Sequence, residues 1–142
     1  MKRIIEVTFV ICILVCSCSN TSKDMAANNI CNEWKLAGFV DVPSSDMKYA
    51  EPDDEWCYVL TFIKGGKLSG MSSTNSFEGA YKIDYFKNSI NISIGFMTKV
   101  CEYLDGELYM ESLKNVHFFS LEKDELKLYY NNRQNYLLFK IQ

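Results

Sequence analysis

The sequence contains few of the residues that metal, nucleotide or nucleic-acid chemistry needs. His117 is its one histidine, and no two cysteines have the Cys-x-x-Cys spacing of a zinc site. Asp and Glu outnumber Lys and Arg by 18 to 15, so no basic surface for a phosphate backbone is expected. Glycine-rich phosphate loops, dinucleotide fingerprints and serine nucleophile elbows are also absent. We therefore expect no metal, no cofactor and no nucleic-acid partner.

The sequence also lacks an apolar run of the ~20 residues that a membrane-spanning helix needs. The run at residues 4–15 is shorter, follows a basic start and leads to Ser17 and Cys18. This order is typical of a secretory signal, and a small residue directly before a cysteine resembles the cleavage motif of bacterial lipoproteins. We predict a lipoprotein signal peptide at residues 1–17 and lipidation of Cys18. The alternative is an ordinary secretory signal whose cysteines are incidental.

The lipoprotein resemblance also implies a location and a partner. We expect the membrane as a partner through the lipid on Cys18, because two or more acyl chains hold a protein firmly. Ser19, rather than Asp, follows this cysteine, which by analogy implies the bacterial cell envelope and its outer membrane, at the periplasmic or the surface face. Residues 18–31 are mostly small and polar and are predicted to form a flexible tether. One domain is predicted at residues 32–142.

Alternating apolar and polar residues dominate this domain and predict a mainly β (α+β) fold. We expect eight strands, at residues 34–40, 56–63, 67–72, 79–85, 89–96, 116–121, 125–130 and 135–141. Gly65 and Gly66 predict a tight hairpin turn, because both central residues of such turns need a positive φ. Since an open sheet edge invites aggregation, the strands are expected to form an antiparallel curved sheet or flattened barrel.

Two segments interrupt the strand pattern. Residues 41–55 hold both prolines of the chain and predict a long loop. Residues 105–115 predict one short amphipathic helix with Asp105 as its cap. Leu104 and Leu108 are one turn apart, as are Tyr109 and Leu113. A helix this short is marginal in isolation, so we expect it to dock on the sheet.

The domain contains three cysteines, Cys31, Cys57 and Cys101. Three thiols allow at most one internal bridge, and the sequence does not choose among the 31–57, 31–101 and 57–101 pairings. Cys101 or Cys57 with His117 would supply the nucleophile and base of a cysteine hydrolase. The preferred interpretation is that cysteine is a small buried residue or a bridge.

Several segments resemble the META domain (HslJ-like) family in the same order. They are Trp34-x-Leu36, Leu68-Ser69-Gly70, Asn75-x-Phe77-x-Gly79-x-Tyr81 and Thr98-x-x-Cys101. The resemblance implies a diverged lipoprotein member with a β-rich envelope domain, associations with stress or drug resistance, and no accepted catalytic residue. The family often has a cysteine at the position of Thr74, so a bridge from there to Cys101 is not possible here. The motif residues Trp34, Asn75, Gly79, Tyr81, Thr98 and Cys101 are expected to be structural.

Aromatic residues are plentiful, with nine Tyr, nine Phe and two Trp. A β core rich in rings is one interpretation. The other is an exposed binding face, for which the candidates are Tyr49, Trp56, Tyr58, Tyr85, Tyr129 and Tyr130. An exposed patch of this kind marks an interaction site.

These observations favour a lipid-anchored binding or interaction domain of the cell envelope without catalytic activity. Its ligand would be a protein, a peptide or a small apolar molecule. One alternative is a structural or stress-protective envelope protein, and a less favoured one is a hydrolase using Cys101 and His117. A hollow barrel would favour a small ligand, whereas a filled barrel with an exposed apolar patch would favour a protein partner.

Overall fold

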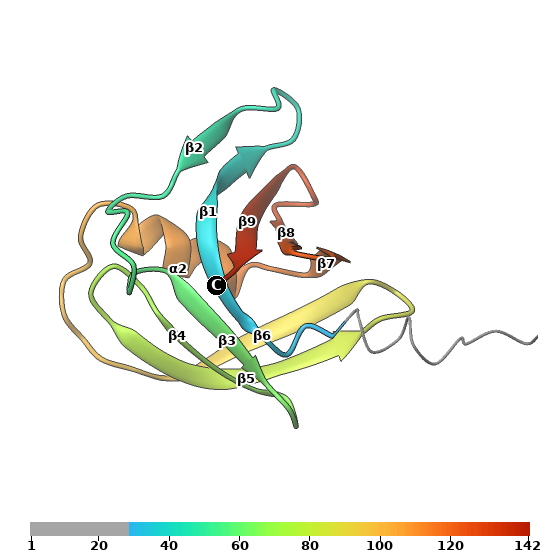
Figure 1. Cartoon of the computed structure of the whole chain (residues 1–142), viewed down its shortest axis with the longest axis horizontal. Helices are drawn as coiled ribbons and strands as arrows, with labels where there is room; N and C mark the ends of the chain where they lie inside the picture. The colour runs from blue at the N-terminus through green and yellow to red at the C-terminus, as the bar shows by residue number, and fades with distance from the viewer. Residues whose placement is uncertain (1–28) are drawn as a thin grey trace, which may run out of the picture.

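The computed structural model describes residues 29–142, which form nine strands and one short helix (Figure 1). The predicted signal peptide, Cys18 and most of the predicted tether lie outside the described residues and stay predictions. No helix within residues 29–142 is long and apolar enough to cross a bilayer.

The strands follow one another along the sheet almost as they do along the chain. They are β1 (Glu33–Asp41), β2 (Met47–Tyr49), β3 (Val59–Ile63), β4 (Lys67–Met71), β5 (Ser76–Asp84), β6 (Ser89–Met97), β7 (Phe118–Glu122), β8 (Glu125–Tyr130) and β9 (Asn135–Ile141), with helix α2 (Gly106–Lys114) between β6 and β7. All neighbours are antiparallel, and β9 pairs with β1 over almost its whole length. The sheet therefore closes into a ring, which confirms the predicted mainly β, barrel-like fold.

The ring has one weak seam, between β6 and β7. Ser89 and Phe118 are the one register pair between these strands, and backbone bonds of 3.0 Å from Ile90 and Phe119 extend the pairing on either side. Helix α2 lies in the chain between these two strands and contacts β6 and β8. The helix therefore packs beside the place where the sheet pairing is weakest.

The predicted loop at 41–55 contains a strand that the sequence did not reveal. Strand β2 pairs with the second half of β1, with Gly38 opposite Tyr49. A Cβ atom at Gly38 would lie 2.5 Å from the carbonyl oxygen of Lys48, so the close approach needs glycine. The expected count of eight strands is one short, because three residues are too few for an alternating pattern to be visible.

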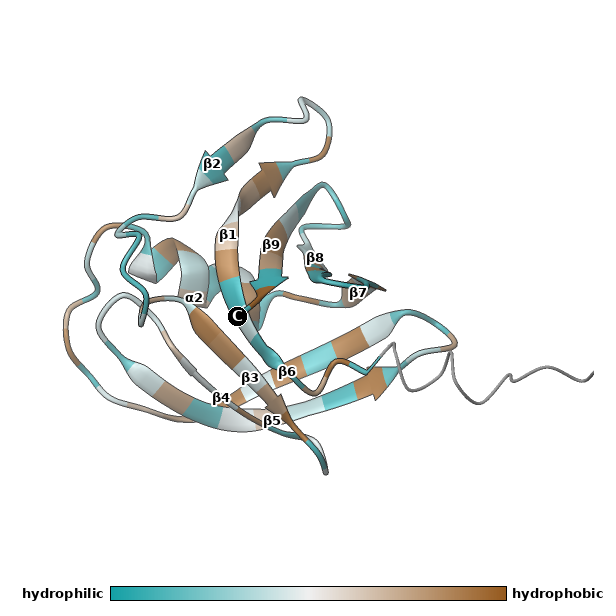
Figure 2. Cartoon of the chain, in the orientation of Figure 1, coloured by the Kyte–Doolittle hydropathy of each residue, from teal (hydrophilic) through white to brown (hydrophobic). Residues whose placement is uncertain are grey.

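The interior of the ring is filled by large side chains. Trp34, Tyr58, Phe62, Phe77, Tyr109 and Phe139 are all fully buried. Figure 2 shows hydrophobic and hydrophilic residues alternating along the strands, as a sheet with one buried face requires. The predicted apolar side of the helix is confirmed for Tyr109 and Leu113, which are both buried. It is wrong for Leu104 and Leu108, which are exposed.

The prediction that Tyr58 lies on an exposed binding face is wrong. Its backbone has a left-handed φ of 55°, just before β3 begins at Val59. This turn directs the ring into the core, where it meets Tyr109 edge-on at 5.3 Å between centroids. The hydroxyl finds a partner by donating to the carbonyl oxygen of Glu51. Alternation alone does not reveal such a change of direction.

Candidate functional site

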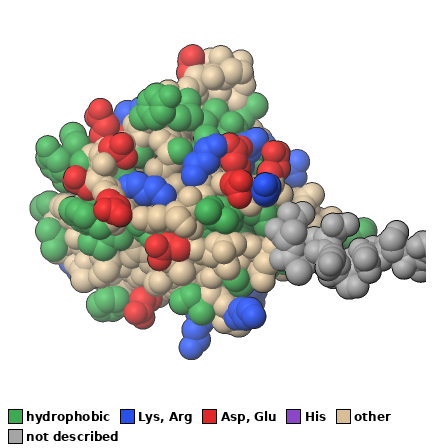
Figure 3. All heavy atoms as spheres, viewed as in Figure 1, with side chains coloured by type: hydrophobic (Ala, Val, Ile, Leu, Met, Phe, Trp, Pro, Cys, Tyr) green, Lys and Arg blue, Asp and Glu red, His purple; other side chains and the backbone are tan. Residues whose placement is uncertain are grey.

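The antiparallel order divides the connections between two ends of the ring. We call the hairpin end the turns at 63–67, 84–89 and 122–125, together with the chain entry at 29–32. We call the loop end the longer connections at 50–58, 72–75 and 98–105. The two ends lie on opposite sides of the molecule in Figure 1. Hydrophobic side chains gather along the left side of the molecule in Figure 3, where Figure 1 places the loop end.

Glu102 joins two of the three connections of the loop end. Its carboxylate accepts hydrogen bonds from Ser72, Ser73, Thr74 and Asn75, at distances of 2.7 to 3.2 Å. Partial burial by itself would raise the pKa of the Glu102 carboxyl, but the hydrogen bonds outweigh it and hold the pKa below its ordinary value. The carboxylate is therefore a charged acceptor that fixes the 98–105 loop to the β4–β5 turn.

The side chain of Asn75 binds the backbone of the same 98–105 loop. Its side-chain oxygen accepts from the Val100 amide at 2.8 Å and from the Thr98 hydroxyl at 2.9 Å. Its side-chain nitrogen donates to the Val100 carbonyl at 2.7 Å. Asn75 is fully buried, so these bonds satisfy an amide that would otherwise be costly to bury. Two of the predicted family-motif residues, Asn75 and Thr98, thus meet in one structural clamp.

Asp105 attaches the third connection. Its side chain accepts from the backbone amide of Glu51 at 3.0 Å and pairs with Lys48. Its own amide donates to the Glu51 carbonyl at 3.0 Å. Asp105 stands at the helix N-terminus as predicted, but its side chain makes no capping bond to the helix. It is used instead to tie loop 50–58 to loop 98–105.

A groove of mixed polarity crosses the outer face of the sheet next to these loops. Three open hollows form it, with volumes of ≈ 520, ≈ 290 and ≈ 500 Å³. The first two hollows share Val59 and Met71, and the last two share Phe96. We call this surface the outer groove, and the apolar side chains that it exposes are those of Trp56, Val59, Met71, Phe96 and Val100. The groove runs from β3 across β4 and β5 to β6 and the loop that follows it.

A β-bulge explains why Phe96 faces the groove. Ile90, Ile92 and Ile94 share a face that points to the core, and Phe96 would join them if the alternation continued. The register shifts between Glu78 and Gly79, so that Gly95 is an extra residue on β6. Phe96 is therefore opposite Glu78 on the outer face and is 61% exposed.

Gly79 permits this bulge. A Cβ atom at that position would lie 2.1 Å from the carbonyl oxygen of Ser93, which is far inside contact distance. Gly79, one of the family-motif residues, therefore has a structural role in a close approach of two backbones. Its effect is to turn Phe96 outward into the groove.

The charges around the groove differ from one end to the other. Glu33 and Glu55 line the hollow that holds Trp56. Lys99 and Lys114 line the hollow that holds Val100. The groove therefore has an acidic end and a basic end on either side of a centre of mixed polarity, where Thr61, Ser69, Ser76 and Glu78 lie beside Met71 and Phe96.

The predicted aromatic residues do not form one face. Tyr49, Trp56 and Tyr85 are exposed, and Trp56 alone of the six lines the groove. Tyr85 lies at the hairpin end, where it packs edge-on against Phe119 at 5.6 Å. Tyr129 and Tyr130 are partly buried on β8, and Tyr129 packs on Tyr136.

The remaining motif residues have structural contacts. Trp34 is buried and donates from its indole nitrogen to the carbonyl of Ile30 at 2.9 Å. Tyr81 is buried, and its hydroxyl donates to the carbonyl oxygen of Ile63 at 3.1 Å. Cys101 is exposed, and its carbonyl accepts from Thr74. The three cysteines of residues 29–142 are all free, so none of the three possible bridges forms.

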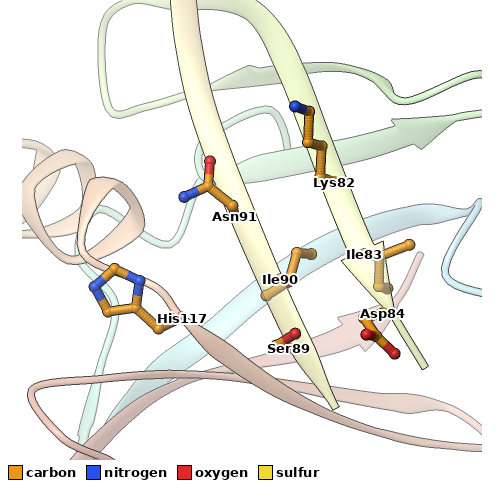
Figure 4. A pocket seen from close by; sticks show the side chains of 7 residues that line it. All are labelled: Lys82, Ile83, Asp84, Ser89, Ile90, Asn91 and His117. Carbon is orange, nitrogen blue, oxygen red and sulfur yellow. The ribbon is translucent and has the colours of Figure 1, made fainter. Parts of the chain in front are cut away.

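His117 and Cys101 lie in different places. His117 lines an open hollow of ≈ 340 Å³ beside the β5–β6 turn (Figure 4). Lys82, Asp84 and Asn91 line the same hollow, and Cys101 does not. Cys57, the other candidate nucleophile, is fully buried, and burial raises the pKa of its thiol, which disfavours the reactive thiolate.

Sequence reasoning missed the residues that build the loop end and the groove. Glu102, Met71 and Phe96 belong to no motif, and each acquires its role from a partner distant in the chain. The run of four polar residues at 72–75 was the one visible signal, because so many adjacent donors need an acceptor when they are buried.

Comparisons with known proteins extend these observations. No family model matches the chain. A protein of Tannerella forsythia named "Putative lipoprotein" is 29% identical over 109 residues, which cover 75% of this chain and 71% of that protein. Its name does not include the META domain, so membership of that family stays a prediction.

Two solved structures share the fold. The crystal structure of a DUF4847 family protein from Bacteroides vulgatus has a TM-score of 0.60 and 17% identity, and covers 78% of this chain and 92% of that one. The NMR structure of a protein from Burkholderia xenovorans has a TM-score of 0.59 and 17% identity, and covers 87% and 88%. At this identity the likeness concerns the fold alone.

Proposed function

We propose that this chain is a lipid-anchored protein of the bacterial cell envelope that binds a protein or peptide segment in the outer groove. The observation that carries the binding role is the adjacency of three open hollows that expose Trp56, Met71 and Phe96. A filled core directs binding to the outside of the ring, because its interior is occupied by buried rings.

The shape and charge of the groove favour an extended segment. The groove crosses four strands. A surface of this length suits an extended peptide, which presents several side chains in a row, better than one compact small molecule. Its acidic end at Glu33 and Glu55 suits a basic residue of the ligand, and its basic end at Lys99 and Lys114 suits an acidic one. Apolar side chains between these charges would pack against Met71 and Phe96.

The lipid anchor is supported by two independent observations. Residues 1–17 have the order of a lipoprotein signal and precede Cys18. The Tannerella forsythia relative carries the word lipoprotein in its name. The outer membrane is the proposed location because Ser19 follows the cysteine.

A binding role without catalysis is also part of the proposal. It is supported by the separation of His117 from Cys101 and by the burial of Cys57. A structural or stress-protective envelope role is the second candidate, and it would leave the outer groove without a ligand. We also propose a distant relation to the META domain family, supported by the clamp that Asn75 and Thr98 form.

The groove is tested with a displayed library of random peptides selected on the folded protein. Selected peptides should bind in the groove, so Phe96→Asp should weaken their binding by about tenfold or more. Tyr49→Ser is the matched control, because Tyr49 is exposed on β2 and lies outside the groove. Peptides that bind both variants as tightly as the wild type would show that the groove is not the binding site.

The anchor is tested by the intact mass of the protein purified from membranes. A mass equal to residues 18–142 plus a diacylglyceryl group and an acyl chain is expected. The unmodified mass of that segment would contradict the anchor without bearing on the groove.

A further inference from the structure

We propose that the hairpin end of the ring lies on the membrane surface, with Phe86 inserted among the lipids and the lysines of two hairpin turns against anionic headgroups. This inference rests on the proposed lipid anchor, and it adds an orientation of the domain and a second contact with the membrane. The contact comes from the folded domain and not from the lipid on Cys18.

The β5–β6 turn presents an aromatic ring that the fold does not use. Phe86 is 95% exposed, and Tyr85 beside it is about half exposed at 48%. An exposed phenylalanine at the tip of a hairpin places an apolar side chain in water, and packing within the domain does not explain it. Aromatic residues at such positions are suited to the boundary between water and lipid.

The turn is held firmly in this shape. The side chain of Asp84 accepts hydrogen bonds from the amides of Phe86 and Lys87 at 2.9 and 3.0 Å. Asn88 takes a left-handed φ of 51°, which completes the reversal into β6. The exposure of Phe86 is therefore a feature of an ordered turn.

Basic residues accompany the ring. Lys82 and Lys87 on the β5–β6 hairpin are exposed, as are Lys64 and Lys67 at the β3–β4 turn. The two turns belong to one end, since the amide of Tyr81 on β5 donates to the carbonyl of Gly66 at 2.8 Å. An aromatic tip among lysines combines the two attractions that hold a protein on an anionic bilayer.

The third turn of the hairpin end marks the limit of the contact. Residues 122–125 carry three acidic side chains and one lysine. Glu122 and Glu125 pair with Lys127 and Lys140, which leaves Asp124 as the acidic group of this turn without an ion pair. The contact is therefore centred on the β3–β4 and β5–β6 turns.

The start of the domain lies beside the same tip. The amide of Ile30 donates to the hydroxyl of Tyr85 at 3.4 Å. Cys18 and Asn29 are 11 residues apart, which span at most about 40 Å when fully extended. The tether to a lipid on Cys18 therefore joins the domain at the hairpin end, on the opposite side of the ring from the loop end.

The test uses the lipidated full chain reconstituted in vesicles of phosphatidylethanolamine and phosphatidylglycerol. Phe86→Trp adds a fluorophore at the hairpin tip, where Phe86 is 95% exposed, and Tyr103→Trp adds one at the loop end, where Tyr103 is 59% exposed. Lipids brominated in their acyl chains should quench the fluorescence added by Phe86→Trp and leave that added by Tyr103→Trp unchanged. Replacing the anionic lipid by phosphatidylcholine should weaken the quenching.

Three results would overturn the proposal. The first is no quenching of Phe86→Trp, and the second is equal quenching of both variants, which means no preferred orientation. The third is crosslinking between two copies through position 86, which means self-association. The intact mass of the same sample tests the lipid anchor separately. Unlipidated protein would contradict the anchor, but the quenching of that protein on added vesicles would still test the insertion of the hairpin tip.

Discussion

At the scale of single residues, the loop end depends on polar side chains that satisfy one another. Glu102 accepts from four neighbouring residues of one turn, and Asn75 holds both backbone groups of Val100. Removing one member leaves buried donors without an acceptor, which costs more than the bond itself contributes. The order of the 98–105 loop therefore rests on very few side chains.

Glu102→Gln should lower the free energy of unfolding by about 2 kcal/mol at neutral pH, because charge-assisted bonds are replaced by weaker ones. Chemical denaturation measures this value. Glu111→Gln is the control, since Glu111 is an exposed residue of α2 and its loss should change little.

The pH dependence of this effect follows from the lowered pKa. The folded protein releases the Glu102 proton at a lower pH than the unfolded chain does, so the stabilisation is complete above the ordinary value of 4.5. It is lost as the pH falls through the folded pKa. The stability difference between wild type and Glu102→Gln should shrink in acid, and a difference that stays constant from neutral to acid pH would contradict this role.

Loss of the hydroxyl should change the stability of the protein in opposite directions at two buried tyrosines. The Tyr109 hydroxyl is buried without a hydrogen-bond partner, whereas that of Tyr58 donates to Glu51. Tyr109→Phe should therefore raise the free energy of unfolding by about 1 kcal/mol, and Tyr58→Phe should lower it by a similar amount. Thermal and urea unfolding measure both, and destabilisation by Tyr109→Phe would mean that its hydroxyl has a partner.

At the scale of elements, the bulge on β6 connects the fold to the proposed site. It moves Phe96 from the core face to the outer face and leaves Met97 packed against the core. The same strand thus contributes three isoleucines to the interior and one phenylalanine to the groove. A substitution that disturbs the bulge should therefore change the position of Phe96 in the groove before it disturbs the closed ring of strands.

Gly79→Ala tests this element. Its Cβ would collide with a backbone carbonyl, so we expect a loss of about 1–3 kcal/mol of stability together with a change in the exposure of Phe96. Gly95→Ala is the matched control, because the nearest atom to its Cβ would be 3.8 Å away. Equal stability of the two variants would show that the bulge does not depend on Gly79.

The elements with a clear period could be predicted from the sequence. Alternation located β8 and β9 within a residue, and the Gly65-Gly66 turn has the positive φ at both positions that was expected. Strand β2 was invisible because three residues have no period. The direction of Phe96 could not be foreseen either, because a bulge changes the parity of a strand without a fixed sequence signal.

The candidate site was less predictable than the fold. Trp56 was the one predicted aromatic residue that lines the groove, and Tyr58 was wrong because a left-handed residue turns it inward. Met71 and Phe96 come together through pairing of strands distant in the chain. Surface neighbours of this kind depend on register, which a single sequence specifies only loosely.

At the scale of the whole molecule, the two ends of the ring differ in character. The hairpin end carries an exposed phenylalanine among lysines, and the loop end carries interlocked polar loops beside the outer groove. This polarity fits a domain that rests on a membrane at one end and exposes its binding surface away from it. The orientation and the groove are separate proposals that fail separately.

The most direct measurement of the central claim is methyl NMR of the protein with and without a peptide selected from the displayed library. Met71 lines the outer groove, while Met110 is buried on the core side of α2. We expect the methyl signal of Met71 to shift on binding and that of Met110 to stay in place. Shifts confined to other methionines, with Met71 unchanged, would contradict the groove as the binding site.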